Sequence, residues 1–428
     1  MATVDPGRVG GLFTRCGNWN LNAFVPRPTV PADSISPVAA AVEAATPRNG
    51  AIDVLRGLSI LLVMLHHLAL PFRLPLGPSA IGEALGRRLV SALSYNGYAA
   101  VYIFFVISGF LIAKRTLEAY GTLGAVDLRS FYVRRASRIL PLLLALLLML
   151  VTLHLLGVPG FVIDKPGQSL GGALLSALGL YLNWYEGQTT WLPANWDVLW
   201  SLSIEELFYL AFPLVCWLLP RRWLLLTLAA LVVSLPWTRG LLDHNEIWQE
   251  KAYLPAMSAI ALGVLTACVL LAVRPSRQFA RSLFALGLLG LVAALICGGE
   301  LWRELRHASL LFIAASAAML LLGIEWARLG APRGLNWLAG MGRLSYELYL
   351  THMFVVLAVV ATYRHLFENQ LTWGFLAYPP AIAGCVLLAA WIERCYCKPC
   401  ERALRARFGM DHDRHVGDSN RVGVDRQQ

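Results

Sequence analysis

Residues 51–70 read AIDVLRGLSILLVMLHHLAL. This stretch is long enough to cross a bilayer as a helix, because about 20 apolar residues span the hydrocarbon. It nevertheless carries Asp53 and Arg56 near its start and His66 and His67 near its end. Ionisable groups inside a membrane helix are usually functional, because a central Arg, Lys or Asp costs about 2.5–3.5 kcal/mol. We therefore expect this helix to form part of a functional wall.

The spacing of Arg56 and His67 places them on one side of that helix. They are eleven positions apart, which is roughly 16 Å along the axis and close to three turns. His66 lies about 100° away around the helix, so only one histidine shares the face of Arg56. The alternative for His67 is a packed histidine that donates to a backbone carbonyl.

The composition indicates a protein with many membrane spans. The 428 residues are 57% hydrophobic and 14% charged, with a mean hydropathy of +0.59, whereas soluble chains are about 45–50% apolar and 25% charged. The net charge of +10 gathers in short loops, as expected for the cytoplasmic side of a membrane protein. We therefore predict a lipid-embedded chain with no nucleic-acid partner.

Ten apolar runs are long enough to span, which predicts an all-α, polytopic transmembrane bundle of about ten helices. They lie at about 51–70, 95–113, 139–157, 198–219, 223–238, 254–273, 282–298, 308–326, 344–363 and 374–392. An eleventh, glycine-rich run at 170–184 is weaker. We expect it to be a re-entrant or surface piece of a long outer segment.

The arginine-rich loops set the expected orientation in the inner (cytoplasmic) membrane. They alternate correctly only if 170–184 does not cross, and both termini are then cytoplasmic. Arg73, Arg87 and Arg88 are exceptions, because they fall in the first outer loop. The charge rule gives no account of them; contact with an anionic ligand is one alternative.

Three parts of the chain are expected: a disordered cytoplasmic tail at 1–49, a transmembrane domain at 50–393 and a basic cytoplasmic tail at 394–428. The tail carries Cys395, Cys397 and Cys400. No fourth ligand stands at zinc-site spacing, so we predict no metal and interpret these thiols as spectators or as acylated groups.

Arginines before the third span are candidates for binding phosphate. Residues 131–141 read FYVRRASRILP, with Arg134, Arg135 and Arg138 one helical turn apart or less. Their guanidinium groups suit phosphate, and coenzyme A offers three phosphates. The alternative is a topology signal that contacts lipid phosphates.

Polar groups in three further spans are candidates for chemistry. Residues 196–212 read WDVLWSLSIEELFYLAF, which puts Glu205 roughly 10 Å below the outer edge, near the depth of His67. An intramembrane carboxylate needs a partner, so we expect the two to interact. Ser108 is a helix-packing residue or a nucleophile, and His352 is a packed histidine or a second site residue. Trp196 and Trp200 mark the interface or stack on a sugar ring.

Five motifs together resemble the acyltransferase 3 family of integral membrane acyltransferases, over residues 49 to 393. That family acylates sugars of lipopolysaccharide, peptidoglycan, nodulation factors and some antibiotics. The matching residues are Arg56 and His67 for Arg–ten residues–His, Arg134, Arg135 and Arg138 for RRxxR, Phe104 to Ile112 for FFxxSGFLI, Trp200 to Glu206 for WSLSxEE, and Ser345 to His352 for SYxxYLxH.

The resemblance implies an O-acyltransferase that uses acetyl-CoA or another acyl-CoA and a glycan acceptor. Some members carry an esterase-like C-terminal domain. We expect this chain to act without such a domain of its own, either alone or with a periplasmic acyl-transfer partner protein. The predicted residues are His67 as general base, Glu205 as its orienting partner, Arg56 beside the donor, Arg134, Arg135 and Arg138 on the donor phosphates, and Asp53, His66, Trp200, Ser203, Glu206 and His352 in substrate binding.

Two functions of other classes remain open at this point. The first is a transporter or flippase of lipid-linked sugars, with the buried charges acting as a proton relay. The second is a structural partner in an envelope complex, which would leave the buried charges a cost without a purpose. Dependence on acyl-CoA separates the enzyme from both.

Overall fold

The computed structural model describes residues 48–368 and 370–409. The expected tail at 1–49 lies outside the described residues except for its last two, and so does the end of the basic tail beyond 409.

Ten of the helices in the described part are long and apolar enough to span a membrane, and no strand occurs there. Their cores are α2 (Gly50–Ala69), α4 (Gly97–Tyr120), α5 (Leu128–Leu155), α9 (Leu199–Leu218), α10 (Arg221–Gly240), α12 (Tyr253–Ala272), α13 (Arg277–Ile296), α15 (Ser309–Trp326), α17 (Ser345–Leu366) and α18 (Tyr378–Ile392). Helix α18 alone has 15 residues, and it reaches spanning length only with the helical segments on either side of it, as Gly374–Arg407. Each of the ten coincides with a predicted span, so the predicted fold class is confirmed.

Short helices make up most of the rest of the bundle. They are α3 (Ala80–Tyr95), α6 (Leu170–Leu178), α7 (Leu182–Thr189), α8 (Ala194–Asp197), α11 (Glu246–Lys251), α14 (Gly298–Leu305), α16 (Asn336–Arg343) and α19 (Lys398–Arg407). Helices α6 and α7 have nine and eight residues, about 12–14 Å each. Because the hydrocarbon is about 30 Å thick, residues 170–184 do not cross it as one helix.

Three helices extend beyond the predicted spans at one end of the bundle. Helix α4 continues to Tyr120, past the predicted end at residue 113. Helix α5 begins at Leu128, capped by the Asp127 carboxylate, which accepts from the Ser130 amide at 3.1 Å. The three candidate phosphate-binding arginines therefore lie inside α5 and not at its first turn as expected. After α18 the chain stays helical through a π-turn at Glu393–Cys397 into α19.

Glycines allow the central helices to approach closely, as is common in membrane bundles. A Cβ on Gly109 of α4 would lie 2.0 Å from the Ile260 carbonyl oxygen of α12, and one on Gly263 would lie 2.1 Å from that of Val106. The two helices thus meet backbone to backbone at the centre of the bundle.

We predict that Gly263→Ala destabilises the protein by about 1–3 kcal/mol, because the added methyl group forces α4 and α12 apart. Gly298→Ala is the matched control, since nothing lies within 4 Å of its Cβ position. The measurement is the thermal unfolding midpoint in detergent. Equal midpoints for the two variants would contradict this account of the contact.

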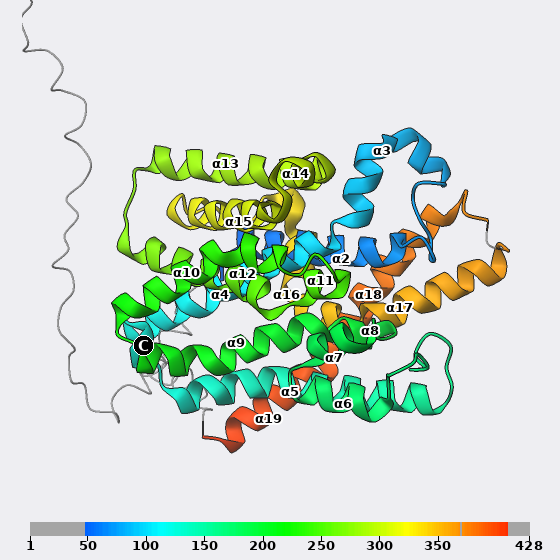
Figure 1. Ribbon diagram of the computed structural model, residues 1–428, viewed down its shortest axis with the longest axis horizontal. Coiled ribbons are helices and arrows are strands. Elements are labelled where there is room, and N and C mark those ends of the chain that lie inside the picture. The colour runs from blue at the N-terminus through cyan, green and yellow to red at the C-terminus, as the bar shows by residue number, and fades with distance from the viewer. Residues whose placement is uncertain (1–47, 369, 410–428) are drawn as a thin grey trace, which may run out of the picture.

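The bundle has two ends of different chemistry. The basic end is defined by Arg48, Arg134 and Arg405, and the histidine end by His67 and Arg73. Helices α2, α5 and α17 start at the basic end, whereas α4 and α9 finish there. Figure 1 shows α13 and α15 along one side of the bundle and α5 and α6 along the other.

Candidate active site

A cavity of about 290 Å³ lies between α2, α4, α5, α9 and α17. Along α4 its lining runs from Val101 to Tyr120, which are nineteen positions or about 28 Å apart along the helix. That length is close to the hydrocarbon thickness. The cavity therefore follows the bundle from the basic end almost to the histidine end.

Arginines crowd the part of the cavity near the basic end. The lining includes Arg48, Arg56, Arg115, Arg134, Arg135 and Arg138. Clefts lined by one sign of charge concentrate ligands of the opposite sign. This end of the cavity suits an anionic ligand that can extend inward.

Arg135 and Glu205 belong to one network in the cavity wall. Arg135 donates to Glu206 at 2.7 Å, lies 4.0 Å from Glu205 and sits 3.4 Å above the Tyr209 ring. Glu205 also accepts from the hydroxyls of Ser108 at 2.5 Å and Tyr209 at 2.7 Å. Both carboxylates thereby receive hydrogen bonds inside the bundle.

The expected pairing of Glu205 with His67 is wrong. Helical spacing predicted the depth of the Glu205 carboxylate along α9 but not its direction around the helix. The carboxylate points toward α4 and α5. Ser108 is the alternative candidate for a nucleophile. Its hydroxyl group donates a hydrogen bond to Glu205.

Two ionisable residues of α2 take part in the basic end. Arg56 donates to the Ser345 hydroxyl at 2.6 Å and lines the cavity. Asp53 is buried and accepts from Arg48 Nε at 2.9 and 2.8 Å. Asp53 therefore holds Arg48 beside the cavity, which places it at the basic end and away from the histidines.

His67 and His352 form a pair at the histidine end, with ring centroids 5.1 Å apart. Arg73 Nη1 donates to the His67 carbonyl at 2.5 Å and lies 3.4 Å from His67 Nδ1. Because a guanidinium only donates, these contacts assign the His67 proton to Nε2. His352 Nδ1 faces the carbonyls of Leu348 and Tyr349 at 3.0 and 2.9 Å, so it carries the proton and Nε2 keeps the lone pair.

A hydrogen bond closes the inner end of the cavity. The hydroxyls of Ser201 and Tyr349 lie 2.7 Å apart, and both residues line the cavity. The Tyr349 ring is 6.2 Å from that of His352, one turn further along α17. The order toward the histidine end is thus cavity, Tyr349, His352, His67 and Arg73.

The comparison with known families agrees with this arrangement. A family model described as an acyltransferase domain matches residues 49–391. The chain belongs to the acyltransferase 3 family. The predicted family is thereby confirmed, over nearly all of the membrane domain.

Curated relatives match a smaller part of the chain. O-acetyltransferase OatA of Staphylococcus aureus strain NCTC 8325 is 34% identical over 130 residues, which are 30% of this chain and 21% of that protein. A protein of S. aureus strain COL with a provisional O-acetyltransferase name is 35% identical over 124 residues, 28% of this chain and 20% of its own length. The chain thus matches about a fifth of these relatives. No solved structure matches the chain significantly.

Three predicted substrate-binding residues of the acyltransferase have other contacts. His66 Nδ1 faces the Ser94 carbonyl at 2.9 Å, and the Ser203 hydroxyl donates to the Leu199 carbonyl at 3.1 Å. Trp200 is 7% exposed and packs edge-on against Phe105, with ring centroids 6.1 Å apart. None of the three lines the cavity, and Trp200 has no open face for a sugar.

The structure accounts for two of the three arginines that broke the charge rule. Arg73 turns inward onto His67, and Arg88 donates to Glu300 at 3.3 Å. Burial lowers the pKa of the Arg73 guanidinium to about 10, against the opposing charge of Asp197. Arg73 therefore stays charged at neutral pH. Its anomalous position in an outer loop was the signal that could have placed it in the site.

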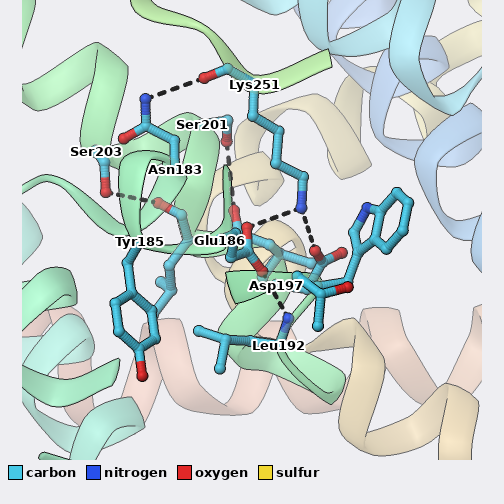
Figure 2. Close-up of polar contacts among 12 residues, drawn as sticks. Asn183, Tyr185, Glu186, Leu192, Asp197, Ser201, Ser203 and Lys251 are labelled. Carbon is cyan, nitrogen blue, oxygen red and sulfur yellow. Dashed lines mark hydrogen bonds and ion pairs between the residues drawn. The ribbon is translucent and has the colours of Figure 1, made fainter. Parts of the chain in front are cut away.

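A buried lysine joins three short segments beside the histidines (Figure 2). Lys251 Nζ donates to Glu186 at 2.8 Å and also to Asp197. The second oxygen of Glu186 accepts from the Leu192 amide at 2.9 Å, and Asn183 donates to the Lys251 carbonyl at 3.0 Å. Sequence reasoning missed this network, because Glu186 and Lys251 looked like ordinary charges of outer loops.

No group of three or more His, Cys, Asp or Glu is placed to hold a metal ion in residues 48–368 and 370–409.

Proposed function

We propose that this acyltransferase moves an acetyl or other short acyl group from acyl-CoA to a hydroxyl of a cell-surface or lipid-linked glycan. It would lie in the inner membrane with the basic end and both termini in the cytoplasm. The observation that carries the proposal is the arginine-lined cavity, which runs from the basic end to within one helical turn of the histidine pair. Membership of the acyltransferase family and the O-acetyltransferase relatives support it.

The donor would occupy the cavity with its phosphates at the basic end. Arg134 and Arg138 offer guanidinium groups there, and Arg135 strengthens the positive potential while it binds Glu206. The pantetheine arm would extend along α4 and bring the thioester to Ser201 and Tyr349. Arg56 would contact the donor where the cavity narrows between α2 and α17.

The histidine pair would take the proton from the acceptor hydroxyl. His352 Nε2 holds a lone pair that can accept that proton directly, and His67 Nε2–H can donate to the developing oxyanion. The sequence alone predicts His67 as the only general base. In the present proposal the proton-accepting and hydrogen-bond-donating roles are divided between His352 and His67. The hydroxyl oxygen bonds to the acyl carbon, the carbon–sulfur bond breaks, and the proton leaves with the coenzyme A thiolate.

The test uses purified protein in lipid nanodiscs, acetyl-labelled acetyl-CoA and surface glycan prepared from the source strain after deletion of this gene. Base-labile label on the glycan, together with release of the coenzyme A thiol in equal amount, supports the proposal. A transporter or flippase would instead move lipid-linked sugar across liposomes without acyl-CoA. That result, with no ester formed, would overturn it.

We predict that Arg138→Gln raises the KM for acetyl-CoA by about 10- to 100-fold, because a hydrogen bond to a charged group contributes about 1.5–3 kcal/mol. Arg277→Gln is the matched control, since Arg277 is exposed at the start of α13 and does not line the cavity. Initial rates at varied acetyl-CoA measure the effect. An unchanged KM in Arg138→Gln would remove this arginine from the donor site.

A further inference from the structure

Helix α8 is held against the histidine end from two sides. On one side, Lys251 binds Asp197, the last residue of α8, and the buried Glu186 of α7 (Figure 2). On the other side, the Asn195 amide donates to the Leu350 carbonyl of α17 at 2.7 Å. A four-residue helix thereby has a fixed position beside the α17 turn that carries His352.

Four buried polar atoms in this region have no hydrogen-bond partner among the described residues: Asn195 Oδ1, Trp196 Nε1, Arg73 Nε and His352 Nε2. Asn195, Trp196 and His352 are 0% exposed and Arg73 is 9% exposed. Most buried polar groups in proteins are hydrogen-bonded, so each exception needs an explanation.

Two of the four atoms belong to residues that contact His67, and the other two belong to α8, which packs on the helix that carries His352. Arg73 binds the His67 carbonyl, and the His352 ring packs on that of His67. Helix α8, with Asn195 and Trp196, packs on α17. His67 itself is only half-buried, so the region is not sealed on every side.

The chemistry of the four atoms selects a class of ligand. Trp196 Nε1 and Arg73 Nε only donate, whereas Asn195 Oδ1 and His352 Nε2 accept. A phosphate or carboxylate would satisfy only the two donors, and an ammonium group only the two acceptors. A hydroxyl group both donates and accepts, so neighbouring hydroxyls satisfy both kinds.

We propose that Asn195, Trp196, Arg73 and His352 form the acceptor subsite, which binds neighbouring hydroxyls of a sugar and presents one of them to His352 Nε2. The inference rests on the proposed function and extends it to residues on α8 that no motif marked. The Lys251 network keeps α8 in the position that this contact needs.

The test is Trp196→Phe, which removes only the indole N–H and part of the ring. With acetyl-CoA and the surface glycan described above, the KM for the glycan should rise about 3- to 10-fold, as expected for one lost neutral hydrogen bond. The KM for acetyl-CoA should not change. Without acceptor, the thermal midpoint should fall less than in the control variant below, because Trp196→Phe loses some packing but also removes a buried donor that has no partner in the resting protein.

Trp326→Phe is the matched control, because its indole N–H donates to the carbonyls of Leu270 and Val273 at 3.2 and 3.1 Å. It should lower the midpoint by about 2–4 °C and leave both KM values unchanged. If Trp196→Phe lowers the midpoint as Trp326→Phe does, its N–H has a partner such as an ordered water, and the proposal is overturned. An unchanged KM for the glycan also overturns it. Failure of the proposed function would appear earlier, as no transfer by the wild-type protein.

Discussion

His67→Ala is expected to abolish detectable acyl transfer while the protein still inserts and folds. Loss of a hydrogen-bond donor to the developing oxyanion costs about 10²- to 10³-fold in rate, and this substitution also removes the ring that packs on His352 and keeps it in position to accept the proton. The Arg73 contact to the His67 carbonyl survives in the variant, because it involves the backbone. The measurement is single-turnover ester formation, with the thermal midpoint recorded beside it.

If His67 and His352 act as a unit, the rate losses of their single and double variants should not add. His352→Ala should lose as much rate as His67→Ala, and the double variant should lose little more, because residues that act as a unit are not additive. His365→Ala is the matched control, since His365 is exposed near the end of the same helix, α17. Normal glycan acylation by His67→Ala would refute the proposed chemistry.

Lys251→Met should destabilise the folded protein by about 3–5 kcal/mol, because it leaves the Glu186 carboxylate buried without its cation. The Lys251 and Glu186 side chains are 3% and 0% exposed, so water cannot replace the lost partner. Lys251→Met combined with Glu186→Gln removes both charges and should recover most of the stability, since Gln can still accept from the Leu192 amide. The midpoint of thermal unfolding measures both effects.

Lys398→Met is the control for this experiment. Lys398 lies 2.9 Å from Glu393 but is 60% exposed, and exposed ion pairs contribute about 0–1 kcal/mol. Equal losses in Lys251→Met and Lys398→Met would show that burial does not set the strength of the network. Failure of the double variant to recover would indicate that Lys251 matters for a reason other than charge.

Much of the fold followed from apolar length and charge bias. Each of the ten predicted spans became a helix, because runs of about 20 apolar residues have few alternatives in a bilayer. The short run at 170–184 was correctly kept out of the set. The starts of helices were less predictable: α5 begins eleven residues before its apolar run, since the Asp127 cap starts the helix at Leu128.

The site was harder to predict, because periodicity gives the face of a residue on its own helix but not which neighbour that face meets. The sequence placed Glu205 and His67 at similar depths, yet Glu205 turns to Ser108 and Tyr209. Likewise, Arg73 and Lys251 lie in loops or short helices, where no periodic signal exists. Their contacts appear only when the loop after α2 folds back onto His67 and when α11 packs beside α7 and α8.

Arg48 and Arg405 line the same cavity although they stand close to opposite termini of the described chain. A fusion partner or affinity tag joined directly before Arg48 or directly after Gly409 would thus sit beside this cavity. Reporters for this protein are better inserted in the segment after α13, at Gly298 and Gly299, where the structure leaves open space.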